Sequence, residues 1–131
     1  MVKPTSGKPG RTNKRAALGQ RGEDLAAEHL RKAGYRIVER NVRTRYGEID
    51  IVAEDGGCIV FVEVRTVASS LMAPEESVNW RKQRRIASLG MRFLQEHGKS
   101  HAEWRADVVA IEIGGDGAPK RVEHYINAVE A

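Results

Sequence analysis

Residues 47–67 read GEIDIVAEDGGCIVFVEVRTV, and the organisation of the whole chain follows from this stretch. Asp55, Gly56 and Gly57 predict a tight hairpin turn between two strands, because such a turn needs positive φ angles that glycine adopts without steric cost. Residues 58–64 form an almost continuous apolar run, which is typical of a strand at the centre of a sheet. The stretch therefore predicts two paired strands around which a sheet is built.

Carboxylates interrupt this apolar hairpin. Because side chains alternate along a strand, Glu63 and Arg65 share the face of the apolar residues that precede them. Glu48 and Asp50 likewise share one face of the first strand. An ionised carboxylate inside an apolar strand is costly unless a positive charge pairs with it. We therefore expect a metal ion, an arginine, or both beside these carboxylates.

Length and composition predict a single soluble domain. The chain has 131 residues, of which 40% are hydrophobic and 31% charged. No apolar run approaches the ~20 residues that a membrane-spanning helix needs, so we expect no membrane partner. The chain has one cysteine, Cys58, which excludes an internal disulfide and favours a cytoplasmic protein.

The positive charge is concentrated at the N-terminus. The net charge is +4, and six basic residues precede the first acidic residue, Glu23: Lys3, Lys8, Arg11, Lys14, Arg15 and Arg21. This distribution suits a polyanionic partner such as nucleic acid, and a solubilising surface is the alternative.

The order of elements predicts an α/β fold with a mixed sheet flanked by helices. Residues 1–14 are rich in Gly, Pro, Ser, Thr and Lys and predict a disordered basic tail before a domain at 15–131. Periodicity predicts helices at 15–33 and from about 75–78 to 97. Strands are expected at 35–42, on both sides of the hairpin turn, and at 103–113 and 121–128.

Two helical residues carry charge at the border of the expected core. Glu23 falls at the edge of the apolar stripe of the first helix. Lys82 falls within the apolar band of the second helix, to which Met91 is also assigned. This lysine must either extend to solvent or meet a carboxylate, and both alternatives are open. The other basic residues of that helix form a separate face.

Four acidic residues are candidates for a metal site: Glu23, Asp50, Glu63 and Asp107. Hard divalent cations such as Mg²⁺ and Mn²⁺ take oxygen ligands, commonly one or two carboxylates together with water and a substrate phosphate. Carboxylates on adjacent strands can converge on one ion. Strand carboxylates also occur in simple salt bridges, so this pattern alone does not decide between the two.

Five blocks of the chain, in order, closely resemble the YraN-type family of uncharacterised bacterial proteins. This resemblance implies a branch of the restriction-endonuclease-like, PD-(D/E)xK superfamily, similar to Holliday-junction resolvases. It also implies their fold, a mixed sheet between helices. The blocks are GQRGEDLAAEHL (19–30), GYRIVERNVRTRYGEIDIVAED (34–55), IVFVEVRT (59–66), KQRRI (82–86) and RADVVAI (105–111).

The resemblance assigns roles to individual residues. Asp50 and Glu63 match the acidic pair that binds Mg²⁺ or Mn²⁺, and Glu23 matches a helix glutamate that adds a ligand or anchors water. Arg65 stands where the family motif has a lysine. Arginine stays protonated, so it holds phosphate but is a poor base. Lys82 is then expected to supply the missing amine from the second helix.

The leading expectation is a metal-dependent nuclease that hydrolyses phosphodiester bonds in DNA, branched DNA included. A nucleic-acid-binding module of the same fold with impaired catalysis is the alternative, and Arg65 favours it. A protein-interaction scaffold, in which the carboxylates form plain ion pairs, is a third. Because junction-resolving relatives act as dimers, a homodimer is also expected.

Overall fold

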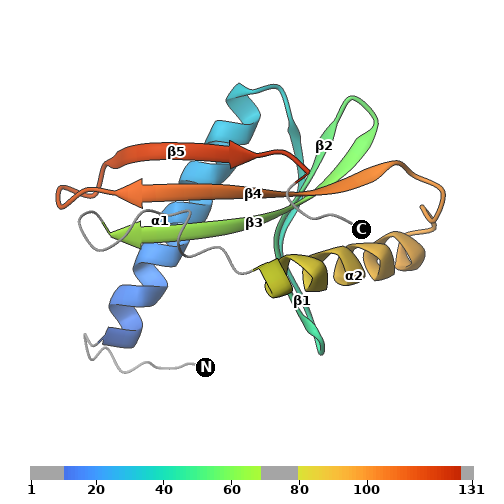
Figure 1. The fold of residues 1–131 in the computed structure, drawn as a ribbon, viewed down its shortest axis with the longest axis horizontal. Helices are drawn as coiled ribbons and strands as arrows, with labels where there is room; N and C mark the ends of the chain where they lie inside the picture. Colours follow the sequence, from blue (N-terminus) through green and yellow to red (C-terminus); the bar gives the residue numbers. More distant parts are fainter. Residues whose placement is uncertain (1–10, 69–79, 128–131) are drawn as a thin grey trace, which may run out of the picture.

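The computed structural model describes residues 11–68 and 80–127, and for residues 11–15 and 80–84 it describes the backbone but not the side chains. Two helices and five strands follow one another along these ranges (Figure 1). The helices are α1 (Arg11–Lys32) and α2 (Trp80–Glu96). The strands are β1 (Arg36–Thr44), β2 (Gly47–Asp55), β3 (Cys58–Ala68), β4 (Trp104–Ile113) and β5 (Pro119–Tyr125).

The five strands form one mixed sheet in the order β1-β2-β3-β4-β5. β3 and β4 are parallel and are joined through α2, whereas the other neighbouring strands are antiparallel. The expected class, an α/β fold with a mixed sheet and two helices, is confirmed. This arrangement is consistent with a restriction-endonuclease-like fold.

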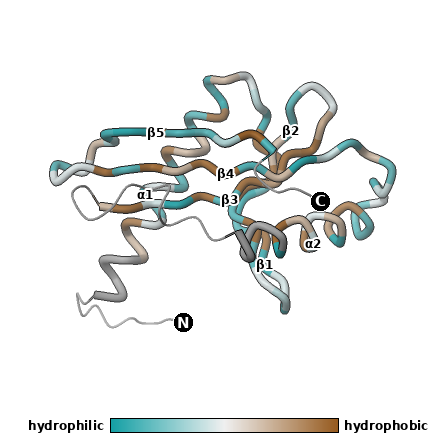
Figure 2. Tube along the Cα trace, in the orientation of Figure 1, coloured by the Kyte–Doolittle hydropathy of each residue, from teal (hydrophilic) through white to brown (hydrophobic). Residues whose placement is uncertain are grey.

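The helices cover opposite faces of the sheet. α1 packs Ala26, Ala27 and Leu30 into one apolar cluster with residues of β2, β3 and β4. α2 packs Ile86, Leu89, Phe93 and Leu94 into a second cluster, which includes Phe61. Residues 59–63 are buried without interruption, which explains the continuous apolar run in β3. Figure 2 shows hydrophobic residues in brown along β3 and β4, whereas the residues of the edge strand β5 are mainly hydrophilic.

Several details differ from the sequence-based expectation. β1 ends at Thr44 rather than at residue 42, and β5 begins at Pro119 rather than at residue 121. α1 begins at Arg11 rather than at residue 15, and residues 1–10 lie outside the described ranges. Met91 was expected in the apolar band of α2, but it is 51% exposed. The neighbouring Gly90 has no side chain and lies directly against the ring of Phe61. This close approach sets which side of α2 faces the sheet and turns Met91 outward.

The predicted hairpin turn is confirmed. Asp55 pairs with Cys58, and Gly56 and Gly57 between them have φ angles of 55° and 93°. Neither helix in the described part of the chain has the length and apolar character needed to cross a membrane.

β2 and β3 separate from each other beyond the middle of this hairpin, and we call this separation the fork. The ladder between β2 and β3 runs from Asp55–Cys58 to Ile51–Val62, whereas β1 stays paired with β2 as far as Thr44–Gly47. β3 meanwhile continues beside β4 to Ala68. The ends of β1 and β2 therefore turn away from β3, as Figure 1 shows. This fork leaves room between β2 and β3 and positions the site described next.

Candidate active site

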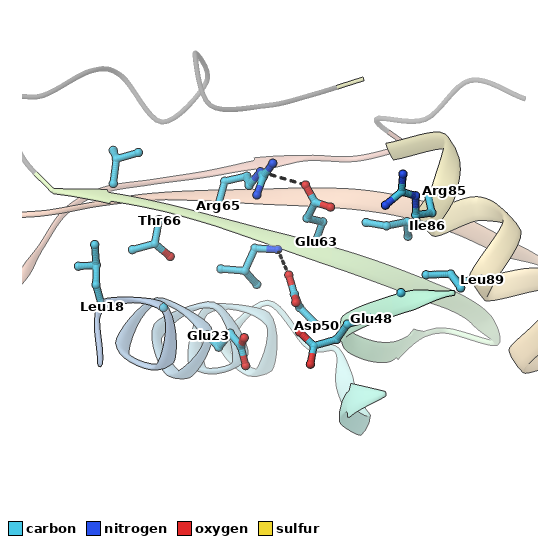
Figure 3. A pocket seen from close by; sticks show the side chains of 14 residues that line it. Leu18, Glu23, Glu48, Asp50, Glu63, Arg65, Thr66, Arg85, Ile86 and Leu89 are labelled. Atoms are coloured by element: carbon cyan, nitrogen blue, oxygen red, sulfur yellow. Dashed lines mark hydrogen bonds and ion pairs between the residues drawn. The ribbon is translucent and has the colours of Figure 1, made fainter. Parts of the chain in front are cut away.

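A cavity of about 710 Å³ opens at the fork. α1, the beginning of β2, the second half of β3 and α2 all contribute to its walls (Figure 3). The lining residues are Leu18, Gly19, Glu23, Gly47, Glu48, Asp50, Glu63, Val64, Arg65, Thr66, Val67, Arg85, Ile86 and Leu89. Of the six candidate site residues predicted from the sequence, Glu23, Asp50, Glu63 and Arg65 are among them.

Asp50 bridges the two diverging strands. Its Oδ2 accepts a hydrogen bond of 2.8 Å from the backbone N–H of Val64. Had the β2–β3 ladder continued, Asp50 would face Glu63 as a backbone partner. The side chain instead satisfies a strand-edge N–H that the separation of the strands leaves open. The fork thus explains why a carboxylate, and not an apolar side chain, occupies this position of β2.

Glu23 reaches the site because α1 packs unusually close to β3. Gly22 faces Thr66 so closely that a Cβ at position 22 would collide with the threonine side chain. The next residue, Glu23, is brought to the cavity wall with a side chain only 17% exposed. Its Oε1 is buried, accepts no hydrogen bond from the described residues and lies 3.8 Å from Nη2 of Arg40. The predicted position of Glu23 at the core border is confirmed.

Three carboxylates converge at this point. One oxygen from each of Glu23, Glu48 and Asp50 lies within 4.8 Å of the others. This spacing allows the three groups to bind a single cation, and all three are hard oxygen ligands of the kind that Mg²⁺ and Mn²⁺ prefer. Glu48 is also paired with Arg43, whose Nε lies 2.9 Å from Glu48 Oε2.

The electrostatics of this cluster disfavour full ionisation. Burial raises the pKa of Asp50 to about 7, and Glu23, Glu63 and Glu48 act in the same direction against the hydrogen bond from Val64. The pKa of Glu23 is also raised, first by burial and then by Glu48, whereas Arg40 and a hydrogen bond from the side chain of Asn41 lower it. A bound cation would favour the ionised form of these carboxylates and relieve the repulsion between them.

Glu63 and Arg65 lie beside this cluster. They point to the same side of β3, as the alternation predicted, and Nε of Arg65 lies 3.0 Å from Oε2 of Glu63. Figure 3 shows this pair and the three converging carboxylates on either side of the β3 ribbon. Glu63 lines the cavity but stands outside the group of three close oxygens. The side chain of Lys82 lies outside the described residues.

Asp107 belongs to a separate buried network. It is fully buried and accepts hydrogen bonds from Arg105 Nε, His124 Nε2 and the backbone N–H of Asn127. Burial opposes its ionisation, but these hydrogen bonds prevail and hold its pKa below the usual value. Arg105 also donates to the hydroxyl of Tyr35 at 2.6 Å. The network ties β4 to β5 and to Tyr35 between α1 and β1, and it does not line the cavity.

Glu48 and Asn41 are among the residues of the site that were not assigned to it from the sequence. Glu48 precedes Asp50 by two positions, so alternation alone placed both on one face and could have identified it. In the β1–β2 ladder, Arg40 pairs with Ile51 and Val42 pairs with Ile49, so Asn41 between them lies opposite Asp50. The backbone φ angle of Asn41 is 54°. Asparagine tolerates this left-handed conformation better than most residues.

The candidate site lies within a region shared with other bacterial proteins. Residues 22–111 match the model of the uncharacterised protein family UPF0102. The UPF0102 protein of Rhodococcus jostii is 47% identical over 113 residues, which cover 86% of this chain and 95% of that protein. That of Geobacter sulfurreducens is 46% identical over 114 residues, covering 86% and 88%. Glu23, Glu48, Asp50, Glu63 and Arg65 all fall within the matched residues.

Proposed function

The chain belongs to the uncharacterised protein family UPF0102, and we propose that it is a Mg²⁺- or Mn²⁺-dependent nuclease that hydrolyses phosphodiester bonds in DNA, branched DNA included. The observation that carries this proposal is the convergence of Glu23, Glu48 and Asp50 in a cavity that also exposes arginine side chains. The fold and the sequence resemblance support a place in the restriction-endonuclease-like superfamily, near Holliday-junction resolvases.

The residues present fit a hard divalent cation. Glu23 Oε1 is a buried acceptor that no donor of the described residues reaches, and the pKa of Asp50 is raised first by burial and then by the neighbouring carboxylates. Glu23, Glu48 and Asp50 would hold the ion, and Glu63 is close enough to act on Asp50 electrostatically. When bound, such an ion polarises a phosphoryl oxygen and lowers the pKa of the attacking water.

The basic side chains of the cavity would bind the phosphodiester. Arg65 and Arg85 line the cavity, and a guanidinium group holds phosphate oxygens through two parallel hydrogen bonds. Because Arg65 stays protonated, it neutralises charge that develops on the phosphate but does not accept a proton. We assign the amine function of the missing motif lysine to Lys82 of α2, whose side chain lies outside the described residues. Symmetric cutting of a junction would further require two copies of the chain.

A second candidate function is favoured by one contact. Arg65 stands where the related nucleases have a lysine, and its guanidinium pairs with Glu63, a predicted metal ligand. A site held this way would bind phosphates without hydrolysing them. The chain would then be a nucleic-acid-binding module of the same fold.

Cleavage and gel-shift assays on single-stranded, duplex and four-way-junction DNA test both functions. Wild type is compared with Asp50→Ala and Glu23→Gln in Mg²⁺, Mn²⁺ or EDTA. Glu28→Gln is the matched control, because Glu28 lies on the same helix and its carboxylate is exposed and pairs with Lys32. The nuclease is supported by metal-dependent cutting that Asp50→Ala and Glu23→Gln lose and Glu28→Gln keeps. Salt-sensitive binding without cutting under every condition would favour the binding module instead.

A further inference from the structure

An exposed aromatic ring stands at the rim of the cavity. Tyr46 occupies the turn between β1 and β2 and is 51% exposed. The next residue, Gly47, lines the cavity and lies against α2, because Leu89 Cδ1 is 3.1 Å from where a Cβ at position 47 would be. The turn is therefore held against α2, and the tyrosine ring lies next to the entrance of the site.

Two guanidinium groups flank this ring. Cζ of Arg92 on α2 lies 4.4 Å from the ring centroid of Tyr46, and Cζ of Arg45 lies 5.4 Å from it. Both arginines are exposed, and neither forms an ion pair with a carboxylate of the described residues. The nearby Arg43 is different, because Glu48 neutralises it at 2.9 Å. We name Tyr46, Arg45 and Arg92 the Tyr46 platform.

The surroundings of the ring set it apart from four other aromatic side chains in the described part of the chain, those of Phe61, Phe93, Trp104 and Tyr35. Phe61, Phe93 and Trp104 pack against one another or against the core, and Tyr35 is held by Arg105. Among these described rings, only Tyr46 combines a residue that is 51% exposed with positive charges that no described carboxylate neutralises. This combination matches a ligand that has both anionic groups and flat aromatic groups.

A nucleic acid strand carries both features, anionic phosphates and flat bases, along one chain. An exposed cation–π contact is weak compared with a charge-assisted hydrogen bond to phosphate. Arg45 and Arg92 would therefore move from the ring to the phosphates of a bound strand and release a ring face for a base. Base stacking on an aromatic side chain requires an open base face, which a fully paired duplex does not offer.

We infer that the Tyr46 platform stacks an unpaired base of a nucleic acid strand whose next phosphates enter the carboxylate cavity. This inference rests on the proposed function for the direction of the strand, but the contact itself needs no catalysis. It specifies the substrate as nucleic acid with an unpaired nucleotide beside the cleavage position, such as a junction, flap or single strand.

The test measures binding in EDTA, so that cleavage plays no part. The intact protein is titrated into single-stranded DNA that contains 2-aminopurine, whose fluorescence reports stacking, and into the matched duplex. We compare wild type with Tyr46→Ala and Tyr46→Phe. Ile126→Ala is the control for an exposed apolar side chain, since Ile126 is 60% exposed and lies after β5.

We expect wild type to quench 2-aminopurine in the single strand. Tyr46→Ala should lose the quenching and bind the single strand about 5- to 150-fold more weakly, with duplex binding unchanged. Tyr46→Phe and Ile126→Ala should behave like wild type. Arg92→Ala should weaken binding to both DNA forms and lower the salt slope by about 1, whereas Arg31→Ala, at an exposed position on α1, should not.

Three results would overturn the inference. These are wild-type binding without quenching, unchanged single-strand binding by Tyr46→Ala, and equal losses for single strand and duplex. The inference can also fail separately from the proposed function. Tyr46-dependent stacking without any metal-dependent cutting would uphold the platform and remove the nuclease. Metal-dependent cutting that Tyr46→Ala leaves unchanged would uphold the nuclease and remove the role of the platform.

Discussion

Replacing Asp50 by asparagine should stabilise the metal-free protein near neutral pH, although it removes a carboxylate from the candidate metal centre. Asparagine has nearly the same shape, and its side-chain oxygen can still accept the hydrogen bond from Val64 that Asp50 accepts at 2.8 Å. Its amide group carries no charge, so the repulsion from Glu23, Glu63 and Glu48 disappears.

The size of the effect follows from the pKa of Asp50. Folding raises this pKa from 3.8 to about 7, chiefly through burial. Each factor of ten in an acid dissociation constant corresponds to ~1.4 kcal/mol, so the folded state loses about 4 kcal/mol when Asp50 must ionise. Because the pKa of Asp50 is higher in the folded state, protonated Asp50 makes its full contribution to wild-type stability below pH 3.8. This contribution is lost as the pH rises through about 7. The advantage of Asp50→Asn should therefore grow over this window and stay constant above it.

Urea unfolding at several pH values in EDTA measures this difference directly. Asp24→Asn is a control of opposite sign, because a hydrogen bond from Arg40 lowers the pKa of Asp24. That variant should lose stability where Asp50→Asn gains it. Adding Mg²⁺ at about 100 times its dissociation constant should stabilise the wild type by about 2.7 kcal/mol and Asp50→Asn by much less. If the unfolding free energies of wild type and Asp50→Asn stay parallel across this pH range, the reasoning about the cluster is refuted.

Three further predictions concern individual residues. Arg65→Lys should preserve or raise cleavage in the DNA assay, and Lys82→Ala should abolish it; full cleavage by Lys82→Ala would exclude its assigned role. The free energy of unfolding of Asn41→Ala should be about 1 kcal/mol lower than that of Asn41→Gly, since glycine adopts the φ of 54° without strain. Both variants should bind Mn²⁺ more weakly than wild type, because the hydrogen bond to Glu23 is lost. Asp107→Asn should cost about 3–5 kcal/mol near neutral pH in urea unfolding. This cost should shrink as the pH falls through the lowered pKa of Asp107, and a cost that is independent of pH would contradict the network.

Local signals in the sequence were sufficient for the elements of the fold. The Asp55-Gly56-Gly57 turn, the apolar run of β3 and the amphipathic helices each depend on residues that are close along the chain. Glu23 could be placed at the core border for the same reason, because helical periodicity determines which side of α1 it occupies. The exposed position of Met91 was missed, since it depends on the contact between Gly90 and Phe61 across the fold.

Residue patterns alone therefore predicted approximately where the strands and helices lie and two of the three converging carboxylates, Glu23 and Asp50, but not Glu48. The assembled fold determined which of those residues meet. The separation of β2 from β3 after Ile51–Val62 directs Asp50 to Val64, and the close packing of Gly22 on Thr66 brings Glu23 to Glu48. Such convergence, and the pKa of about 7 that it imposes on Asp50, depends on distances between segments far apart in the chain, which periodicity and local propensity do not encode.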